Sequence, residues 1–321
     1  MKKILTLLAI LTMISATSGL SGESAWTPDR ATEVVVGSAA GGGADLHGRT
    51  MAEIALQYGW ITTPMIFNYQ TGATGNIAFG YTLNKEDDPH TIMNAVGSYD
   101  VAAIINDSPI KIQNMGVLAV TVLDEYLVCV SKDSPYKTFD DLIEGMRSNP
   151  GTITWSGGLT GALEDVVFKL LCQQTGVSGS YVGFDGQSDA IVALLGGHIS
   201  VGIFVPSASA GHIESGDFIP LTVFSTKRLG GLFSEVKTAR ELGYDIVMSL
   251  PRGFLCSPKM PANAQAFYRD MISKVTETPE WHKYTAKNQI TERTMIGEEA
   301  KQFLYDNAAR ITAVLEAAGV L

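Results

Sequence analysis

The sequence predicts an α/β fold, in which helices pack on the faces of β-sheets. Short runs rich in β-branched and aromatic residues alternate with helical stretches along the 321 residues, and glycine-rich loops repeatedly join a strand to the next helix. Hydrophobic residues make up 45% of the chain and charged residues 17%, which is enough apolar material for packed cores. No repeat and no low-complexity linker divides the chain, so any two lobes must be joined by strands.

The first part of the chain is mainly strands, each followed by a loop. A helix is expected over 45–58, and another after the glycine loop at 71–76. The expected strands are short and rich in Val, Ile, Leu and aromatic side chains, as buried strands are. They span 33–36, 64–69, 91–96, 116–122 and 126–130.

The clearest helix start is at Thr138. This threonine can act as the N-cap, and Asp140 and Asp141 fall in the first turn, where their negative charge complements the helix dipole. The turn at 149–151 ends this helix. Further strands are expected at 152–155, 181–184, 199–204, 221–225 and 252–257, and further helices at 162–175, 188–195, 238–242, 262–276 and 298–318.

Residues 1–24 have the pattern of a secretory signal peptide. Lys2 and Lys3 form a positive segment, residues 4–14 are almost all apolar, and small residues follow at 15–19. The apolar run is shorter than the roughly 20 residues that a transmembrane helix needs. We therefore expect cleavage, export and a periplasmic location, with a retained membrane anchor as the alternative.

The net charge of −10 and the scarce cysteines limit the function classes. Nucleic acid is excluded as a partner, because its phosphates need clustered cations. If the ligand is an anion, the overall field opposes it, so local dipoles must attract it. The three cysteines lack metal-type spacing and the five histidines form no HExxH motif, so we expect no metal and no cofactor. One disulfide or three thiols both fit the cysteine count.

Four loops in the same strand-to-helix position carry the expected binding chemistry. In open α/β sheets, ligands bind beyond the carboxyl ends of the strands, where helix N-termini offer N–H groups and glycine lets the backbone come close. Several such loops together form an anion site without Arg or Lys. The glycine run at 41–43 lacks GxGxxG spacing and no P-loop motif occurs, which disfavours nucleotides. The four loops span 37–45, 71–76, 156–161 and 185–188.

Two polar residues in these loops have two interpretations each. Asp45 either caps its helix or holds a water or a ligand hydroxyl. Asn76 either offers its amide to the ligand or stabilises its own turn. Catalysis is disfavoured, because the chain has no GxSxG nucleophile elbow and no serine or cysteine with a recognisable histidine partner. A secreted hydrolase with a scattered triad stays as the alternative.

Six segments occur in an order and spacing that resemble a known family. They are 34–45 (VVVGSAAGGGAD), 71–78 (TGATGNIA), 134–142 (SPYKTFDDL), 149–151 (NPG), 184–198 with its FDGQSDA and LLGGH ends, and 238–244 (TARELGY). Over nearly its whole mature length the chain resembles the solute-binding receptors of tripartite tricarboxylate transporters, the Bug family.

The resemblance implies a two-lobed α/β fold like that of periplasmic binding proteins. This is a type II-like Venus flytrap with the ligand cleft between the lobes. After the signal peptide at 1–24, lobe 1 is expected to comprise 25–127 plus 226–321, and lobe 2 to comprise 128–225. We expect the chain to cross between the lobes along 126–130 and along 221–225.

The resemblance also assigns ligand-binding residues. In the family, the first two loops hold a carboxylate, partly through ordered waters, and the second lobe selects the rest of the ligand. Carried over to this chain, the first lobe supplies Ser38, Ala39, Gly42, Asp45, Thr71, Gly72, Ala73, Thr74 and Asn76, and the second lobe supplies Ser156, Gly158, Thr160, Phe184 and Asp185.

Three positions bear on specificity. The first loop begins Gly37-Ser38, where relatives usually have proline and an aromatic residue, which leaves more space or polarity beside the ligand. Asp185 stands where relatives often have lysine or another polar residue, and in the cleft it would repel a second carboxylate or accept a hydrogen bond from an amine or a hydroxyl. Arg252 is the nearest candidate for a cationic ligand partner, and a surface or interlobe arginine is the alternative.

The resemblance implies a binding protein rather than an enzyme, acting as a monomer. The expected partners are a small organic carboxylate and a membrane complex of one large and one small subunit. A receptor that presents its closed form to a signalling protein is the alternative. The polar first loop and the absence of clustered cations favour a monocarboxylate or a small dicarboxylate over citrate.

Overall fold

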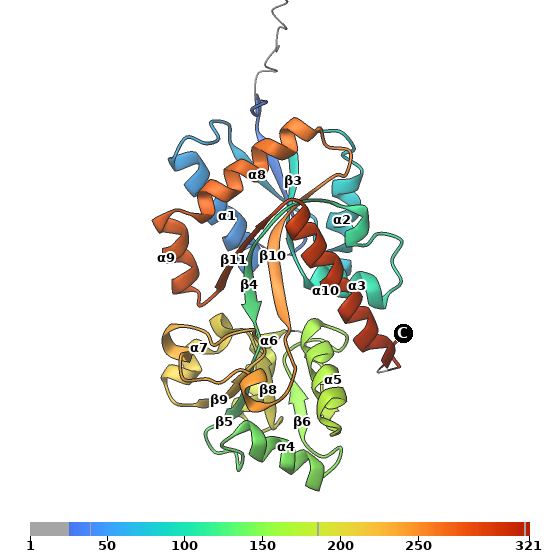
Figure 1. The fold of residues 1–321 in the computed structure, drawn as a ribbon, viewed down its shortest axis with the longest axis vertical. Helices are drawn as coiled ribbons and strands as arrows, with labels where there is room; N and C mark the ends of the chain where they lie inside the picture. The colour runs from blue at the N-terminus through green and yellow to red at the C-terminus, as the bar shows by residue number, and fades with distance from the viewer. Residues whose placement is uncertain (1–25, 39, 185, 318) are drawn as a thin grey trace, which may run out of the picture.

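The computed structural model describes residues 26–38, 40–184, 186–317 and 319–321, which form two stacked halves, each built around its own β-sheet (Figure 1). The predicted signal peptide at 1–24 lies outside the described residues. Within the described ranges, no helix is long and apolar enough to cross a membrane. The two-lobed α/β fold expected from the sequence is confirmed.

The larger sheet has six strands in the order β11-β4-β10-β3-β1-β2. β1 is parallel to both β2 and β3, so the loops after these three strands leave the same edge of the sheet. β10 is antiparallel to β3 and β4 and lies between them. The strands are β1 (Thr32–Val36), β2 (Met65–Tyr69), β3 (Thr91–Val96), β4 (Gly116–Glu125), β10 (Ser249–Cys256) and β11 (Thr291–Ile296).

The smaller sheet has five strands in the order β7-β6-β8-β5-β9. β6 is parallel to β7 and β8, whereas β5 is antiparallel to β8 and β9. In Figure 1, β6 points from the lower half toward the upper half. The strands are β5 (Leu127–Ser131), β6 (Thr154–Ser156), β7 (Ser180–Tyr181), β8 (Val201–Phe204) and β9 (Phe218–Val223).

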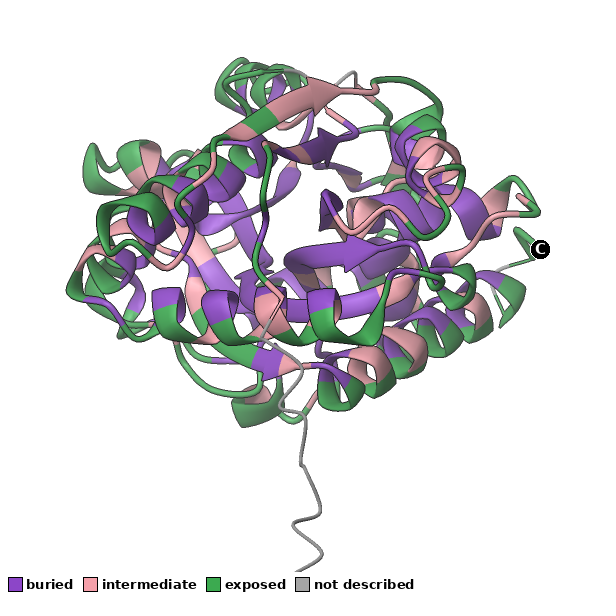
Figure 2. Cartoon of the chain, turned by 90° about the horizontal axis from the view of Figure 1, so that it is seen from above, coloured by how far each residue is buried: buried purple, intermediate pink, exposed green. Residues whose placement is uncertain are grey.

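Helices cover both sheets, with buried strands inside and exposed helix faces outside (Figure 2). Those around the larger sheet are α1 (Gly43–Gln57), α2 (Asn76–Leu83), α3 (Ser98–Ile105), α8 (Ala262–Thr276), α9 (Pro279–Lys287) and α10 (Glu298–Ala317). Those around the smaller sheet are α4 (Phe139–Ser148), α5 (Leu163–Thr175), α6 (Gln187–Leu195) and α7 (Pro206–Glu214). α10 packs against both α3 and α5, and therefore touches both halves.

The helix start predicted at Thr138 is confirmed as a complete capping box. The Asp141 N–H donates to Thr138 Oγ1 at 3.1 Å, and the Thr138 N–H donates to Asp141 Oδ2 at 3.0 Å. Each bond satisfies a backbone N–H that an uncapped helix would leave free. The hydrophobic side chains of Phe139, Leu142 and Met146 then face the core of the smaller half.

The predicted crossing points are partly wrong. The chain leaves the larger sheet at Tyr126, but β9 lies wholly within the smaller sheet, so 221–225 is not a crossing strand. Phe233 and Val236 are buried in the same cluster as Val223, which keeps 226–247 on the smaller half until the chain returns at Met248. The two crossings lie side by side, because the Phe224 N–H donates to Tyr126 O and the Met248 N–H donates to Phe224 O, each at 2.9 Å.

Several elements were not predicted from the sequence. These are α3, α7, α9 and β11, while the expected strand at 181–184 is only the two-residue β7 and the expected helix at 238–242 is the 3-10 turn Arg240–Leu242. α9 carried a readable start signal, since Thr278 is its N-cap and Pro279 its first residue. β11 is an edge strand of the larger sheet, and its central residues are exposed. Its sequence therefore lacks the apolar pattern that marks a buried strand.

We expect Gly75→Ala to lower the free energy of unfolding by about 2–4 kcal/mol. Gly75 has φ 88°, and an added Cβ would lie 2.2 Å from the Tyr99 ring. Gly59→Ala is the matched control, because Gly59 has φ 68° with no atom within 4 Å of the added Cβ, and we expect it to cost only about 1 kcal/mol. Urea denaturation compares the two variants, and equal costs would show that contact with Tyr99 adds nothing.

Candidate functional site

In the larger half, the first two predicted loops meet over one aromatic ring. Added Cβ atoms at Gly37 and Gly75 would lie 3.0 Å and 2.2 Å from atoms of Tyr99, which is 3% exposed. Burial raises the pKa of the Tyr99 hydroxyl, while the neighbouring Ser38 hydroxyl and Gly37 backbone lower it. Ser38 Oγ and Tyr99 Oη are neighbours, but among the described residues neither makes a hydrogen bond of good geometry. Two hydroxyls are thus desolvated at one place, and a bound polar group would relieve that cost.

The second loop has an unusual backbone. Gly72, Ala73, Thr74 and Gly75 have φ values of 117°, 45°, 47° and 88°, and only glycine tolerates positive φ without cost. Strain of this kind gathers at functional segments, where surrounding structure must hold it. Thr71 and the following three residues are exposed.

The side chain of Asp45 ties the first loop to the start of α1. Its Oδ2 accepts from the Gly41 N–H at 2.8 Å, its Oδ1 accepts from the Tyr69 hydroxyl at 2.7 Å, and Arg49 pairs with it at 3.0 Å. Although burial raises the pKa of Asp45, the Gly41 N–H, Tyr69 and Arg49 together hold it below its usual value. The carboxylate therefore serves the loop and the helix start, which favours the capping interpretation. Gly42 is the N-cap residue of α1.

Asn76 also has a local partner. Its Oδ1 accepts from the Ser108 hydroxyl at 2.8 Å, which ties the start of α2 to the segment after α3. This bond gives Asn76 a structural role, although its partner lies 32 positions away and not in its own turn. Ala39 and Asp185, two other predicted site residues, lie outside the described residues.

In the smaller half, the third and fourth loops pack against each other. The Phe184 N–H donates to Gly158 O at 3.0 Å, and the Tyr181 hydroxyl accepts from the Gly158 N–H at 3.2 Å. An added Cβ at Gly183 would lie 2.5 Å from Thr160 Oγ1. Ser156 is fully buried at the carboxyl end of β6, and within the described ranges its hydroxyl has no hydrogen-bond partner. The structure thus brings together Ser156, Gly158, Thr160 and Phe184.

The loop–helix junctions of the two halves share one construction. In both, a glycine N–H donates to the carboxylate four residues later at 2.8 Å, from Gly41 to Asp45 and from Gly161 to Asp165. In both, that carboxylate pairs with a cation a further four residues on, Arg49 or Lys169. The shared pattern is Gly-x3-Asp-x3-Arg/Lys, a signal present in the sequence that the residue-by-residue prediction missed.

The two groups of loops approach each other across the gap between the sheets. An added Cβ at Gly161 in the smaller half would lie 3.3 Å from Ile105 Cδ1 at the end of α3 in the larger half. Tyr126, where the chain crosses, is buried between them. Burial raises the pKa of its hydroxyl well above the usual value, and the carboxylates of Glu164 and Asp124 raise it further. Acidic groups from both halves therefore lie near the crossing.

Arg252 is neither a surface arginine nor free of partners. It is 8% exposed and forms a salt bridge with Asp124, which is fully buried on the neighbouring strand β4. An added Cβ at Gly43 would lie 2.7 Å from its Nη1, so its guanidinium faces the first turn of α1. The interpretation of Arg252 as a surface side chain is wrong, because strand pairing in β10 places it inside the larger half.

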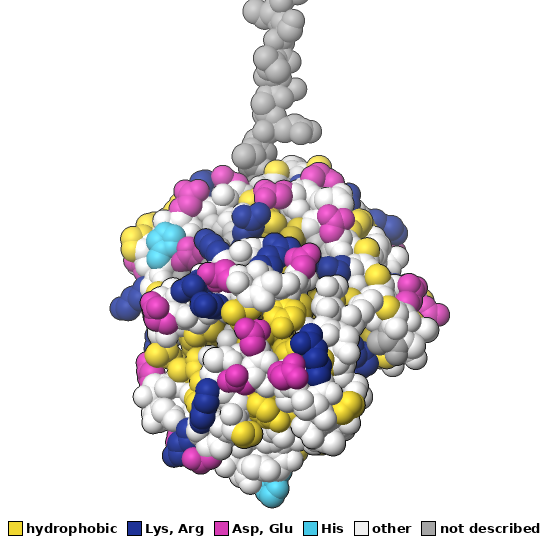
Figure 3. All heavy atoms as spheres, turned by 60° about the horizontal axis from the view of Figure 1, so that its bottom comes forward, with side chains coloured by type: hydrophobic (Ala, Val, Ile, Leu, Met, Phe, Trp, Pro, Cys, Tyr) yellow, Lys and Arg dark blue, Asp and Glu magenta, His cyan; other side chains and the backbone are white. Residues whose placement is uncertain are grey.

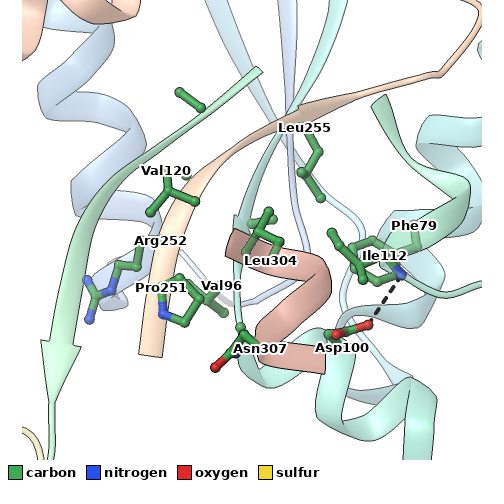
Figure 4. A pocket seen from close by; sticks show the side chains of 14 residues that line it. Phe79, Val96, Asp100, Ile112, Val120, Pro251, Arg252, Leu255, Leu304 and Asn307 are labelled. Carbon is green, nitrogen blue, oxygen red and sulfur yellow. Dashed lines mark hydrogen bonds between the residues drawn. The ribbon is translucent and has the colours of Figure 1, made fainter. Parts of the chain in front are cut away.

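Two other hollows lie away from these loops. The pocket in Figure 4 is mostly apolar and lies under α10, lined by Phe79, Val96, Leu255 and Leu304, while the guanidinium of Arg252 points away from it. A larger groove between the halves is lined by β11 and by 226–231, and no described residue of the four loops lines it. Figure 3 shows one face of the molecule, where Lys and Arg side chains lie among Asp and Glu.

The described residues offer neither a grouped set of metal ligands nor a reactive thiol. In 26–38, 40–184, 186–317 and 319–321, no three His, Cys, Asp or Glu side chains are grouped to hold a metal ion. Cys129, Cys172 and Cys256 are free, and Cys129 and Cys256 are buried, which confirms three thiols in place of a disulfide. Burial raises the pKa of the Cys172 thiol to about 11, so it is not a reactive thiolate near neutral pH.

Comparisons with known proteins agree with this architecture. Residues 51–320 match the model of the tripartite tricarboxylate transporter family receptor. The chain belongs to this receptor family. It is 28% identical over 259 residues to the protein BugT of Bordetella pertussis, covering 79% of this chain and 78% of BugT. The resemblance to the Bug family is confirmed.

Solved structures show the same fold in this receptor family. A TctC solute-binding protein from Polaromonas, without ligand, has a TM-score of 0.80 at 20% identity, covering 90% of this chain and 99% of that one. A protein of Rhodopseudomonas palustris with adipate has a TM-score of 0.77 at 20% identity, covering 91% of this chain and 98% of that one. At this identity the likeness establishes the fold.

Breaking the buried Arg252–Asp124 salt bridge should destabilise this receptor strongly. We expect Arg252→Met to lower the free energy of unfolding by about 3–5 kcal/mol, because Asp124 is left buried without its partner. The double variant Arg252→Met/Asp124→Leu should recover much of this loss, since no lone charge remains. Urea denaturation of the single and double variants measures the coupling, and strictly additive losses would mean that the pair does not interact energetically.

Glu125 should make stability fall as pH rises. Burial raises the pKa of Glu125 from 4.5 to about 8, and Asp124 adds to the rise. Since the folded pKa lies above the unfolded one, the stabilising proton is fully present below about pH 4.5 and is lost as pH rises through 8. Glu125→Gln removes this titration. Urea denaturation measures the free energy of unfolding of both proteins. The value for the wild type minus the value for Glu125→Gln should fall between about pH 5 and pH 8. A difference that does not change with pH would contradict the raised pKa of Glu125.

Proposed function

We propose that this receptor captures a small organic carboxylate between its two lobes, outside the cytoplasm, and delivers it to a membrane transporter of one large and one small subunit. The observation that carries the proposal is a set of three buried hydroxyls: Ser38 in the first loop, Tyr99 on α3 beside that loop, and Ser156 at the end of β6. Ser38 and Tyr99 lie in the larger half and Ser156 lies in the smaller half, and none makes a hydrogen bond of good geometry among the described residues. Buried polar atoms are normally paired, so groups left free together mark a place for a ligand.

The backbone around these hydroxyls suits an anion. The first two loops precede the N-termini of α1 and α2, where free N–H groups and the helix dipole favour negative charge. The positive-φ segment 72–75 lies directly before α2, and its residues 72–74 are exposed. A related protein with bound adipate shows that the fold accepts a carboxylate ligand.

The division into lobes follows from packing. Instead of lobe boundaries at 127 and 225, we propose that lobe 1 comprises 26–125 and 248–321 and that lobe 2 comprises 127–247. Phe233 and Val236, which pack on the smaller sheet, support this placement of 226–247. Residues 126 and 248 then act as the hinge, and ligand favours the closed form because only there do both lobes contact it.

Binding alone accounts for the site. The buried hydroxyl of Ser156 has no histidine within its hydrogen-bonded surroundings in the described chain, as a nucleophile would need. We therefore propose that the receptor performs no chemistry on its ligand. We also propose that it acts as a monomer and is exported to the periplasm after removal of residues 1–24. Ala39 and Asp185 remain proposed ligand contacts together with Ser38, Thr71, Gly72, Ala73, Thr74, Gly158, Thr160 and Phe184.

A thermal-shift screen tests the proposal. Mono- and dicarboxylates, amino acids and neutral sugars are added to the purified protein. A ligand at about 100 times its Kd should stabilise by roughly 2.7 kcal/mol, a rise of several degrees in Tm. Shifts confined to compounds with a carboxylate support the proposal. Shifts from sugars alone, or none from any carboxylate, contradict it.

Variants then locate the site. Tyr99→Phe and Ser156→Ala each remove one free hydroxyl and should weaken binding about tenfold, near 1.4 kcal/mol. Tyr58→Phe is the control, because Tyr58 is exposed at the end of α1 and its hydroxyl donates to Glu280. Unchanged affinity in both site variants would place the ligand elsewhere.

A further inference from the structure

The helix starts on the two walls of the proposed ligand site differ by one acidic side chain. In the shared Gly-x3-Asp-x3-Arg/Lys construction, the residue before the loop-closing aspartate is Ala44 in the larger half and Glu164 in the smaller half. The other parts of the two junctions correspond. The first turn of α1 thus presents a small neutral side chain at this position, whereas the first turn of α5 presents a carboxylate.

Glu164 is held toward the third loop. The Gln187 side-chain amide donates to Glu164 Oε1 at 2.7 Å, and the other end of that amide accepts from the Val205 N–H at 3.1 Å. Because the amide is oriented by the backbone, its N–H group is directed at Glu164. An added Cβ at Gly157 would lie 2.8 Å from Glu164 Cγ, and one at Gly158 would lie 3.6 Å from Oε2. Oε2 therefore stands beside the loop that carries Ser156.

The charge of Glu164 is not balanced by a neighbouring cation. In the described part of the chain Glu164 forms no salt bridge, since Lys169 on the same helix pairs with Asp165. Burial raises the pKa of Glu164, which reflects the cost of an uncompensated carboxylate there. A helix N-terminus ordinarily attracts a ligand anion, but here the first turn of α5 already holds two carboxylates.

We propose that Glu164 is the specificity-determining residue of this receptor, selecting a carboxylate ligand that also bears an ammonium group and rejecting a second carboxylate. This inference rests on the proposed function. The ligand carboxylate faces the loop at 72–75 and the first turn of α1, where Arg49 pairs with Asp45 and the guanidinium of Arg252 lies close. Its ammonium group faces Glu164 Oε2, supplying the missing positive charge and donating a charge-assisted hydrogen bond. A distal carboxylate in the same place meets like charge in a desolvated site.

Three probes of equal chain length test this assignment by calorimetry. 4-Aminobutyrate, butyrate and succinate carry an ammonium, a methyl or a second carboxylate at the end opposite the common carboxylate. For the wild-type protein we expect 4-aminobutyrate to bind about tenfold or more tightly than butyrate, and succinate to bind most weakly. This comparison needs no variant, so a variant that fails to fold does not affect it.

Glu164→Gln separates charge from shape. The amide keeps the size of the side chain and should reduce the preference for 4-aminobutyrate over succinate about 100-fold. Glu164→Asp keeps the charge and should restore part of the preference. Glu214→Gln is the matched control, because Glu214 is exposed on α7 of the same half and should leave all three affinities unchanged.

The possible results separate the two proposals. If succinate or butyrate binds as tightly as 4-aminobutyrate, or if Glu164→Gln leaves the order of affinities unchanged, the role of Glu164 is overturned while carboxylate binding stands. If no carboxylate binds in the broader thermal-shift screen, the proposed function itself fails.

Discussion

The arrangement of this receptor depends on where its chain passes between two sheets. Tyr126 and Met248 mark the two passages, and Phe224 lies between them, joined to both by backbone hydrogen bonds of 2.9 Å. A connection confined to adjacent strands allows the halves to rotate but keeps their facing edges in register. The loops at the carboxyl ends of β1, β2 and β6 therefore meet repeatedly in the same relative position. α10, which packs on α3 and α5, adds a contact that spans both halves.

Hydrogen bonds and ion pairs within each half fix the shape of the loops at those edges. Asp45 and Asp165 each take up the N–H of the glycine four residues earlier, and each is neutralised by Arg49 or Lys169. The loop shape is thereby fixed before a ligand arrives, so less conformational entropy is lost on binding. The strained segment 72–75 is held in a similar way, because Gly75 packs on the ring of Tyr99.

The interior near the hinge holds more acidic than basic side chains. Asp124 is paired with Arg252, but Glu125 and Glu164 have raised pKa values that burial causes. Because successive residues of a strand point to opposite faces, Asp124 and Glu125 direct their carboxylates to different sides of β4. Charge in such a site is expensive unless a ligand compensates it, and this links ligand choice to the stability of the closed form.

Much of the fold was readable from the sequence because its signals are local. The capping box at Thr138, the helix at 262–276 and the strand–glycine–helix order depend on residues within a few positions of one another. The family resemblance added the two lobes and assigned Ser156, Gly158, Thr160 and Phe184 to the second lobe. What only the tertiary structure decided involves residues far apart in the chain. Arg252 meets Asp124 across 128 positions, and Tyr99 fills the space left by Gly37 and Gly75. Likewise, Glu164 is oriented by Gln187, and 226–247 packs on the smaller sheet. The physical reason is that strand order and loop packing choose these partners, and neither leaves a periodic or short-range trace in the sequence.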